Sequence, residues 1–168
     1  MKRAILWGIA SILLLASCYQ GHGLSPPEET SGIEGRITFI GAWPDSTKEV
    51  RIAVLKNFPE GMTDPDSLLN FVITNLSSLS DPLPMGIDHH DYQLLLDPGH
   101  YAWVLVVWLP ANLFGIKELG AYYLDPNNLT LPTPITVLAG VLLQGIDIVA
   151  DFANVHNEKP FFKRESMP

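Results

Sequence analysis

The sequence of 168 residues contains a single cysteine, Cys18, and few positive charges. One cysteine cannot form an intramolecular disulfide or a cysteine-based zinc site, so the fold must depend on its hydrophobic core. Ten lysines and arginines against 18 aspartates and glutamates give a net charge of −8 at neutral pH. This negative charge argues against binding to nucleic acid and against electrostatic attraction to anionic lipid.

The common sequence signatures of catalytic and cofactor sites are also absent. The chain has no G-x-S-x-G, S-x-x-K, G-x-G-x-x-G or HExxH sequence and no phosphate-binding loop. We therefore predict that the protein is not an enzyme and has no cofactor.

Possible metal ligands are concentrated in Asp88-His89-His90-Asp91, with His100 close by in the sequence. Adjacent residues of a strand point to opposite faces, so only one of the two neighbouring histidines could share a face with His100. A solvated loop that leads into a strand explains the cluster better. The sequence therefore predicts no metal site.

The only long apolar run in the sequence lies at its start, and it is almost wholly apolar. Lys2 and Arg3 precede the apolar residues 4–15, and two small residues then lead to Cys18. The run is shorter than the roughly 20 residues that a membrane-spanning helix needs. A basic end, a short apolar stretch and small residues are typical of a secretory signal.

Leu15-Ala16-Ser17-Cys18 resembles the lipobox of bacterial lipoproteins. In that family the cysteine thiol receives a diacylglycerol, the leader is cut before the cysteine, and the new amino group is acylated. The resemblance implies that residues 1–17 are a signal peptide and that Cys18 bears a lipid that attaches the chain to a membrane. The alternative is an ordinary signal peptide followed by a chance cysteine.

Residues near the cut site also bear on location. Loss of Lys2 and Arg3 with the leader takes the net charge from −8 to −10. Tyr19, rather than an aspartate, follows Cys18, and by resemblance to Gram-negative sorting this favours the outer membrane. We expect a lipid-anchored protein of the bacterial cell envelope, with other envelope proteins as its partners.

The rest of the chain divides by composition. Residues 18–31 are rich in Gly, Pro, Ser and Glu and are expected to form a flexible tether, and residues 154–168 a C-terminal tail. In residues 32–153, β-branched and aromatic runs alternate with turn signals. This predicts an all-β fold, a single antiparallel β-sandwich of about seven strands, an architecture shared by immunoglobulin-like domains. The expected strands cover residues 35–41, 50–56, 92–96, 100–109, 119–124, 135–138 and 141–152.

Turn residues predict how some of these strands connect. Asp97-Pro98-Gly99 is expected to close a hairpin between residues 92–96 and 100–109, and Ala139-Gly140 a hairpin between residues 135–138 and 141–152. Residues 67–73 allow either a short strand or one or two helical turns. We favour the strand, within a long loop that crosses between the sheets.

Three segments resemble the carboxypeptidase-regulatory-like, or transthyretin-like, β-sandwich domain that is often attached to bacterial surface lipoproteins. They are Gly35–Phe39 with the following Trp43-Pro44, Leu96–Tyr101, and Gly145–Ile148. The family implies an accessory or adhesive module with no catalytic residues. Full-length relatives usually carry this domain beside another.

The run Tyr101–Leu109 is apolar on both predicted faces, although a sandwich strand usually has one polar face. Either residues 57–88 or the Phe161-Phe162 pair covers the outer face, or that face is exposed and binds a partner or a sugar. The candidate patch consists of Trp103, Trp108, Tyr122 and Tyr123. The sequence thus favours a non-enzymatic binding or structural module, with a carbohydrate- or ligand-binding surface lipoprotein as the alternative.

Overall fold

The computed structural model describes residues 30–59, 62, 64–111, 115–125 and 131–156. The signal peptide, Cys18, most of the tether and Phe161-Phe162 lie outside these residues. The first described element begins at Gly32 and the last ends at His156.

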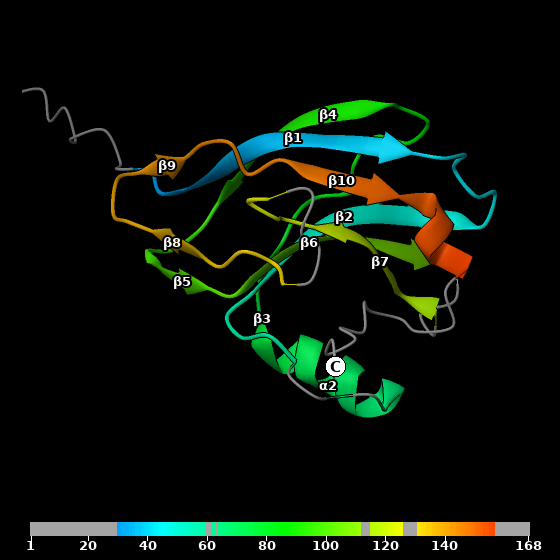
Figure 1. Cartoon of the computed structure of the whole chain (residues 1–168), viewed down its shortest axis with the longest axis horizontal. Coiled ribbons are helices and arrows are strands. Elements are labelled where there is room, and N and C mark those ends of the chain that lie inside the picture. Colours follow the sequence, from blue (N-terminus) through cyan, green and yellow to red (C-terminus); the bar gives the residue numbers. More distant parts are fainter. Residues whose placement is uncertain (1–29, 60–61, 63, 112–114, 126–130, 157–168) are drawn as a thin grey trace, which may run out of the picture.

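Two β-sheets face each other across one core, which confirms the predicted all-β sandwich (Figure 1). In the β1 sheet, β1 pairs antiparallel with β4 and parallel with β9 and β10. In the β6 sheet the order is β3-β2-β6-β7, and all neighbours are antiparallel. β5 and β8 form a separate antiparallel ribbon. The strands are β1 (Gly32–Ile40), β2 (Thr47–Leu55), β3 (Leu76–Leu79), β4 (His89–Leu95), β5 (Gly99–Tyr101), β6 (Trp103–Pro110), β7 (Lys117–Ala121), β8 (Ile135–Val137), β9 (Leu142–Leu143) and β10 (Ile148–Asp151).

The described residues form ten strands rather than about seven. The expected strand 100–109 is interrupted at Ala102 and becomes β5 and β6, and residues 141–152 divide into β9 and β10. β3 is the additional strand. The parallel pairing of β1 with β9 and β10 is a further difference from a purely antiparallel sandwich.

Both predicted hairpins are wrong. β4 pairs with β1, whereas β6 pairs with β2 and β7, so the Asp97-Pro98-Gly99 turn carries the chain from one sheet to the other. β8 pairs with β5, and β9 and β10 pair with β1, so Ala139-Gly140 also joins different sheets. Turn residues specify a reversal of direction, but the apolar faces of the next strand decide which sheet it joins.

The core between the sheets has the alternation expected from the sequence. In β1, Ile37 and Phe39 are buried, whereas Arg36 and Thr38 are exposed. In β10, Ile148 and Ala150 are buried and Val149 is exposed. The opposite sheet contributes Val50, Ile52, Val54, Val104, Val106 and Trp108.

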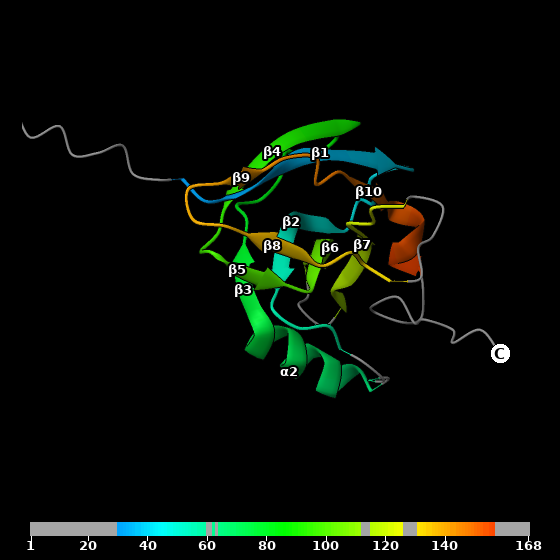
Figure 2. The same cartoon turned by 60° about the vertical axis from the view of Figure 1, so that its left-hand side comes forward.

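The second face of β6 is covered by the helix α2 (Pro65–Asn75). Leu68, Phe71 and Val72 of α2 belong to a second apolar cluster with Trp103, Leu105 and Val107 of β6. Figures 1 and 2 both place α2 on the side of the β6 sheet that faces away from the β1 sheet. The outer face of β6 is therefore covered by a segment within residues 57–88, which was one of the two expected covers.

The favoured strand at residues 67–73 is wrong, because this segment lies within α2. The Asp64 carboxylate accepts a hydrogen bond from the Ser67 backbone N–H at 2.8 Å, and Pro65 stands in the first turn. Both features are typical of helix starts. The helix of 11 residues brings Leu68, Phe71 and Val72 to one face. Nowhere in the described part of the chain is a helix long and apolar enough to cross a membrane.

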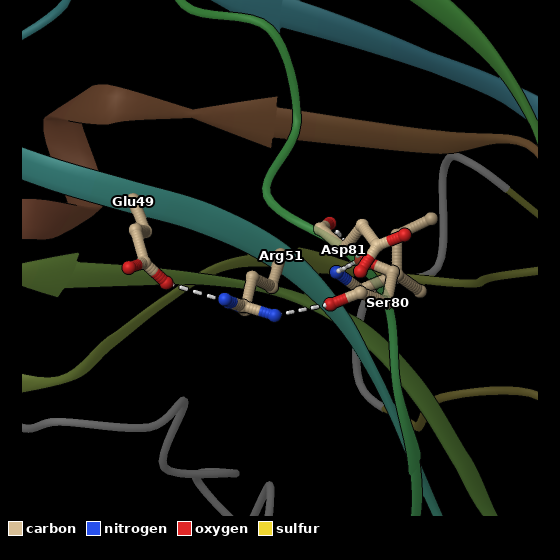
Figure 3. A network of polar contacts seen from close by, with 5 residues as sticks. Glu49, Arg51, Ser80 and Asp81 are labelled. Atoms are coloured by element: carbon tan, nitrogen blue, oxygen red, sulfur yellow. Dashed lines mark hydrogen bonds and ion pairs between the residues drawn. The ribbon is translucent and has the colours of Figure 1, made fainter.

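After β3 the chain continues along β2 before it crosses to the β1 sheet. The Arg51 guanidinium donates to the Glu49 carboxylate and to the Ser80 carbonyl, both at 2.6 Å (Figure 3). The Ser80 hydroxyl accepts from the Ile52 N–H at 2.9 Å and donates to the Asp81 carbonyl. Leu83 then enters the core between the sheets. These bonds hold the crossing segment against the edge of β2.

At the end of β10 the chain turns into the 3-10 helix η3 (Phe152–His156). β10 also lies close to β7 of the other sheet, so this side of the sandwich is nearly closed. A Cβ atom on Gly120 of β7 would overlap the Val149 carbonyl of β10. Glycine is therefore required where the two sheets meet.

We expect Gly120→Ala to lower the free energy of unfolding by about 1–3 kcal/mol, because the added methyl group would push β7 and β10 apart. Urea unfolding measures the change. Gly99→Ala is the control: its Cβ would make only ordinary contact with the Tyr101 ring, and the expected change is within about 0.5 kcal/mol. Equal stability of the two variants would contradict the close approach.

Candidate functional site

The four aromatic residues of the predicted patch do not form an exposed surface. Trp103 is 1% exposed and Trp108 is 6% exposed. Trp103 lies on the helix side of β6, with its ring 5.0 Å from that of Phe58, while Trp108 lies in the core between the sheets. Tyr122 is buried in that same core, and half-buried Tyr123 packs against the helix-side cluster.

The prediction of an exposed aromatic patch is therefore wrong for this set of residues. They are divided between two cores because β6 lies in the middle of three layers. The Trp108 indole N–H donates to the Thr47 hydroxyl at 2.8 Å. Trp103, Trp108 and Tyr122 are therefore buried in the cores and not available to a ligand, and Tyr123 is only partly exposed.

The histidines of the sequence cluster are also separated. His89 and His90 lie on β4, and His100 lies on β5, which belongs to a different sheet. The His100 imidazole is 3.4 Å from the Thr136 hydroxyl. Within the described ranges, no three His, Cys, Asp or Glu side chains come together as a metal site.

A shallow polar depression of about 500 Å³ lies on the outer face of the β1 sheet. It forms where β1, β4 and the loop before β10 meet. The Arg36 guanidinium makes a two-pronged contact with the Asp91 carboxylate, with N–O distances of 2.6 and 3.1 Å. The Arg36 backbone N–H donates to the Asp147 carboxylate at 2.7 Å. Glu34 also lines the depression, which thus holds three carboxylates and one guanidinium.

The floor of this depression is held by backbone contacts. The buried Tyr92 hydroxyl donates to the Ile146 carbonyl at 2.7 Å, and the Ile146 N–H donates to the Glu34 carbonyl at 3.1 Å. A Cβ atom on Gly35 would overlap that same Ile146 carbonyl, so only glycine allows the loop to lie this close to β1. Burial raises the pKa of the Tyr92 hydroxyl, which therefore stays a neutral donor.

The charged groups of the depression are paired with each other. The hydrogen bond from Arg36 lowers the pKa of the Asp91 carboxyl, so Asp91 is ionised at neutral pH. A general acid needs the opposite shift. A ligand would have to compete with Asp91 for Arg36. Sequence reasoning noted Gly35-Arg36 and Gly145-Ile146-Asp147 as parts of a family resemblance, but it did not bring them together.

A second hollow, of about 460 Å³, lies between the edge strands of the two sheets. Ser77 and Ser78 of β3 line one side, and Leu95 to Pro98 line the other. Thr30 and Ser31 complete it, so it lies where the described chain begins. No local signal in the sequence indicates this hollow, because it arises from strands of different sheets.

Substitutions in α2 test whether this helix buries the aromatic residues of β6. Leu68 of α2 is buried against β6, whereas Ile73 of the same helix is exposed. We expect Leu68→Ala to lower the free energy of unfolding in urea by about 2–5 kcal/mol because it leaves a cavity beside Trp103. Ile73→Ala, the control, should change it by less than about 1 kcal/mol. Equal effects of both substitutions would mean that α2 does not seal this face.

The ion pair of the depression predicts an acid-sensitive part of the stability. A carboxyl whose pKa is lowered by folding stabilises the folded state above its unfolded pKa, near 3.8 for Asp91, and loses this effect as the pH falls through its folded pKa. Thermal unfolding from neutral pH to about pH 2 should therefore show a smaller acid-induced fall in Tm for Asp91→Asn than for the unmodified chain. Gln93→Glu is the charge-changing control on β4. Parallel Tm curves for Asp91→Asn and the unmodified chain would contradict the pairing.

Comparison with protein-family models, curated proteins and solved structures finds no match for this chain.

Proposed function

We propose that the protein is a lipid-anchored component of the bacterial cell envelope whose β-sandwich acts as a non-enzymatic binding or structural module. The observation that carries this proposal is Leu15-Ala16-Ser17-Cys18 at the end of a short apolar run that begins after Lys2 and Arg3. A lipid on Cys18 would hold the chain on a membrane, since each buried methylene contributes about 0.8 kcal/mol. Tyr19 after Cys18 favours the outer membrane.

The position of the folded part supports an anchored module. Residues 19–29 separate Cys18 from Thr30, the first described residue, and β1 begins at Gly32. Gly, Pro, Ser and Glu predominate in this interval, a composition typical of linkers. The sandwich would then stand close to the membrane that holds Cys18.

The electrostatics of the described surface support a binding or structural role over catalysis. In the polar depression, Arg36 forms an ion pair with Asp91, and its backbone N–H donates a hydrogen bond to Asp147. The pKa of Asp91 is lowered, which suits a structural ion pair. Envelope proteins are the proposed partners.

We also propose kinship with the carboxypeptidase-regulatory-like, or transthyretin-like, domains. Two of the three resembling segments, Gly35–Phe39 in β1 and Gly145–Ile148 before and at β10, lie side by side in one sheet. The third, Leu96–Tyr101, passes between sheets instead of closing a hairpin. The proposal of an envelope module therefore depends on the lipobox and not on this kinship.

Lipid attachment is tested by expressing the full chain in a Gram-negative host with labelled palmitate. The chain should take up the label, and mass spectrometry should find an acylated Cys18 at the mature N-terminus. Cys18→Ser should lose both the label and the cleavage before residue 18. Ser17→Ala, which keeps a small residue before the cysteine, should keep both. Unchanged labelling of Cys18→Ser would refute the proposed anchor.

A further inference from the structure

The turn between β8 and β9 has an unusual composition for a turn on a protein surface. It consists of Leu138-Ala139-Gly140-Val141, and all four residues are exposed, with Leu138 at 61%. Surface turns are dominated by Gly, Pro, Asn, Asp and Ser, which suit both the backbone geometry and water. This turn instead presents leucine and valine to the surroundings.

Two further leucines extend the apolar surface beside this turn. In the β1 sheet, Gly32 pairs with Leu95 of β4 on one side and with Leu142 of β9 on the other. Leu95 is 63% exposed, and Leu142 is half-buried. We call Leu95, Leu138, Ala139, Val141 and Leu142 the apolar end.

The β8–β9 side of the apolar end is free of charge, whereas the exposed Asp97 follows Leu95 by two residues and lines a hollow with it. Residues 136–146 contain no acidic or basic side chain, although the whole sequence has 28 of them. A surface without charge can be placed against lipid without the cost of removing an ion from water. It also needs no anionic lipid, which suits a chain with a large excess of negative charge.

The apolar end is hydrogen-bonded to the residues at which the tether joins the sandwich. The Gly32 N–H donates to the Val141 carbonyl at 3.1 Å, and the Gly140 N–H donates to the Ser31 hydroxyl at 2.9 Å. On the other side, the Leu96 N–H donates to the Ser31 carbonyl at 3.0 Å. Figures 1 and 2 both show the start of β1 at the same end of the molecule as β5, β8 and β9.

The opposite end of the sandwich is built differently. There the Trp43 ring packs against Phe39 and Phe152, with ring centroids 4.9 and 4.6 Å apart, and η3 follows Phe152. Ile40, at the end of β1, is 48% exposed at this end. A nine-residue strand is roughly 26 Å long, so Ile40 is far from Gly32.

We propose that the apolar end rests on the lipid surface to which the tether is anchored. This rests on the proposed lipid attachment at Cys18. A segment from Cys18 to Thr30 spans at most ~43 Å when extended and ~20 Å as a flexible coil. The tether therefore keeps this end near the bilayer at a high effective concentration, so a small apolar contact is sufficient to orient the sandwich.

The test uses the full chain, processed and lipidated in cells, with Ala139→Cys at the apolar end or Ile40→Cys at the opposite end as control. Lipidation consumes the thiol of Cys18, so the introduced cysteine is the one free thiol and takes an environment-sensitive fluorophore. The protein is reconstituted into vesicles of phosphatidylethanolamine and phosphatidylglycerol that contain a nitroxide-labelled phospholipid. The fluorophore at residue 139 should lose most of its emission, and the one at residue 40 should keep it. Adding Leu138→Ser and Val141→Ser to Ala139→Cys should restore emission.

Three results would overturn the inference. Equal quenching at residues 139 and 40, in protein that floats with the vesicles, would leave the anchor intact but refute the orientation. Two reactive thiols per chain without flotation would refute the anchor and the orientation together. A fluorophore at residue 139 that is unquenched in vesicles but shielded in isolated envelopes would assign the apolar end to a protein partner instead of lipid.

Discussion

Burial of both faces of β6 is the constraint on which the rest of the fold depends. Val104, Val106 and Trp108 point into the sandwich, while Trp103, Leu105 and Val107 point away from it. Its neighbour β2 has the same division, since Ile52 and Val54 face the core, whereas Ala53 and Leu55 face α2. One opposing sheet cannot cover two faces. The helix between β2 and β3 is therefore as necessary to the fold as the second sheet, because without it the aromatic and aliphatic side chains of β6 would be exposed to water.

The periodicity of the sequence predicted well which side chains of a strand are buried, but it predicted poorly which strands pair with each other. The alternation of Ile37 and Phe39 with polar residues in β1, and that of Ile148 and Ala150 in β10, is present as expected. The two-sided apolar character of β6 was also visible, but it left open whether the outer face is covered or exposed, and the structure covers it with α2. The two hairpins failed because a Pro-Gly or Ala-Gly turn has the same local chemistry whether the next strand joins the same sheet or the other one. The segment 67–73 failed because the helix start is signalled by Asp64-Pro65, outside the segment itself.

The functional surfaces were harder to predict for a related reason. Tryptophan and tyrosine in a strand indicate a ligand surface only if the strand is exposed, and here the layer arrangement buries them. The polar depression and the apolar end are produced by the register of β1 with β4, β9 and β10, which brings together residues far apart in the sequence. Arg36 and Asp91, for example, are 55 residues apart. The only local signals of these surfaces in the sequence were glycines such as Gly35 and Gly145. A glycine allows a close backbone approach, but the sequence does not tell which segment makes that approach.

The parallel pairing of β1 with β10 also has a consequence for when the domain can fold. Residues 37–40 pair with residues 148–151, so β1 acquires this neighbour only after residues 148–151 have been synthesised. Until then β1 lacks one side of its sheet, and the core lacks Ile148, Ala150 and Phe152. Contacts between such distant residues form slowly, because a long loop must close before they contribute. With this topology the pairing of β1 with β10 forms late in folding, because residues more than 100 positions apart in the sequence must first be brought together.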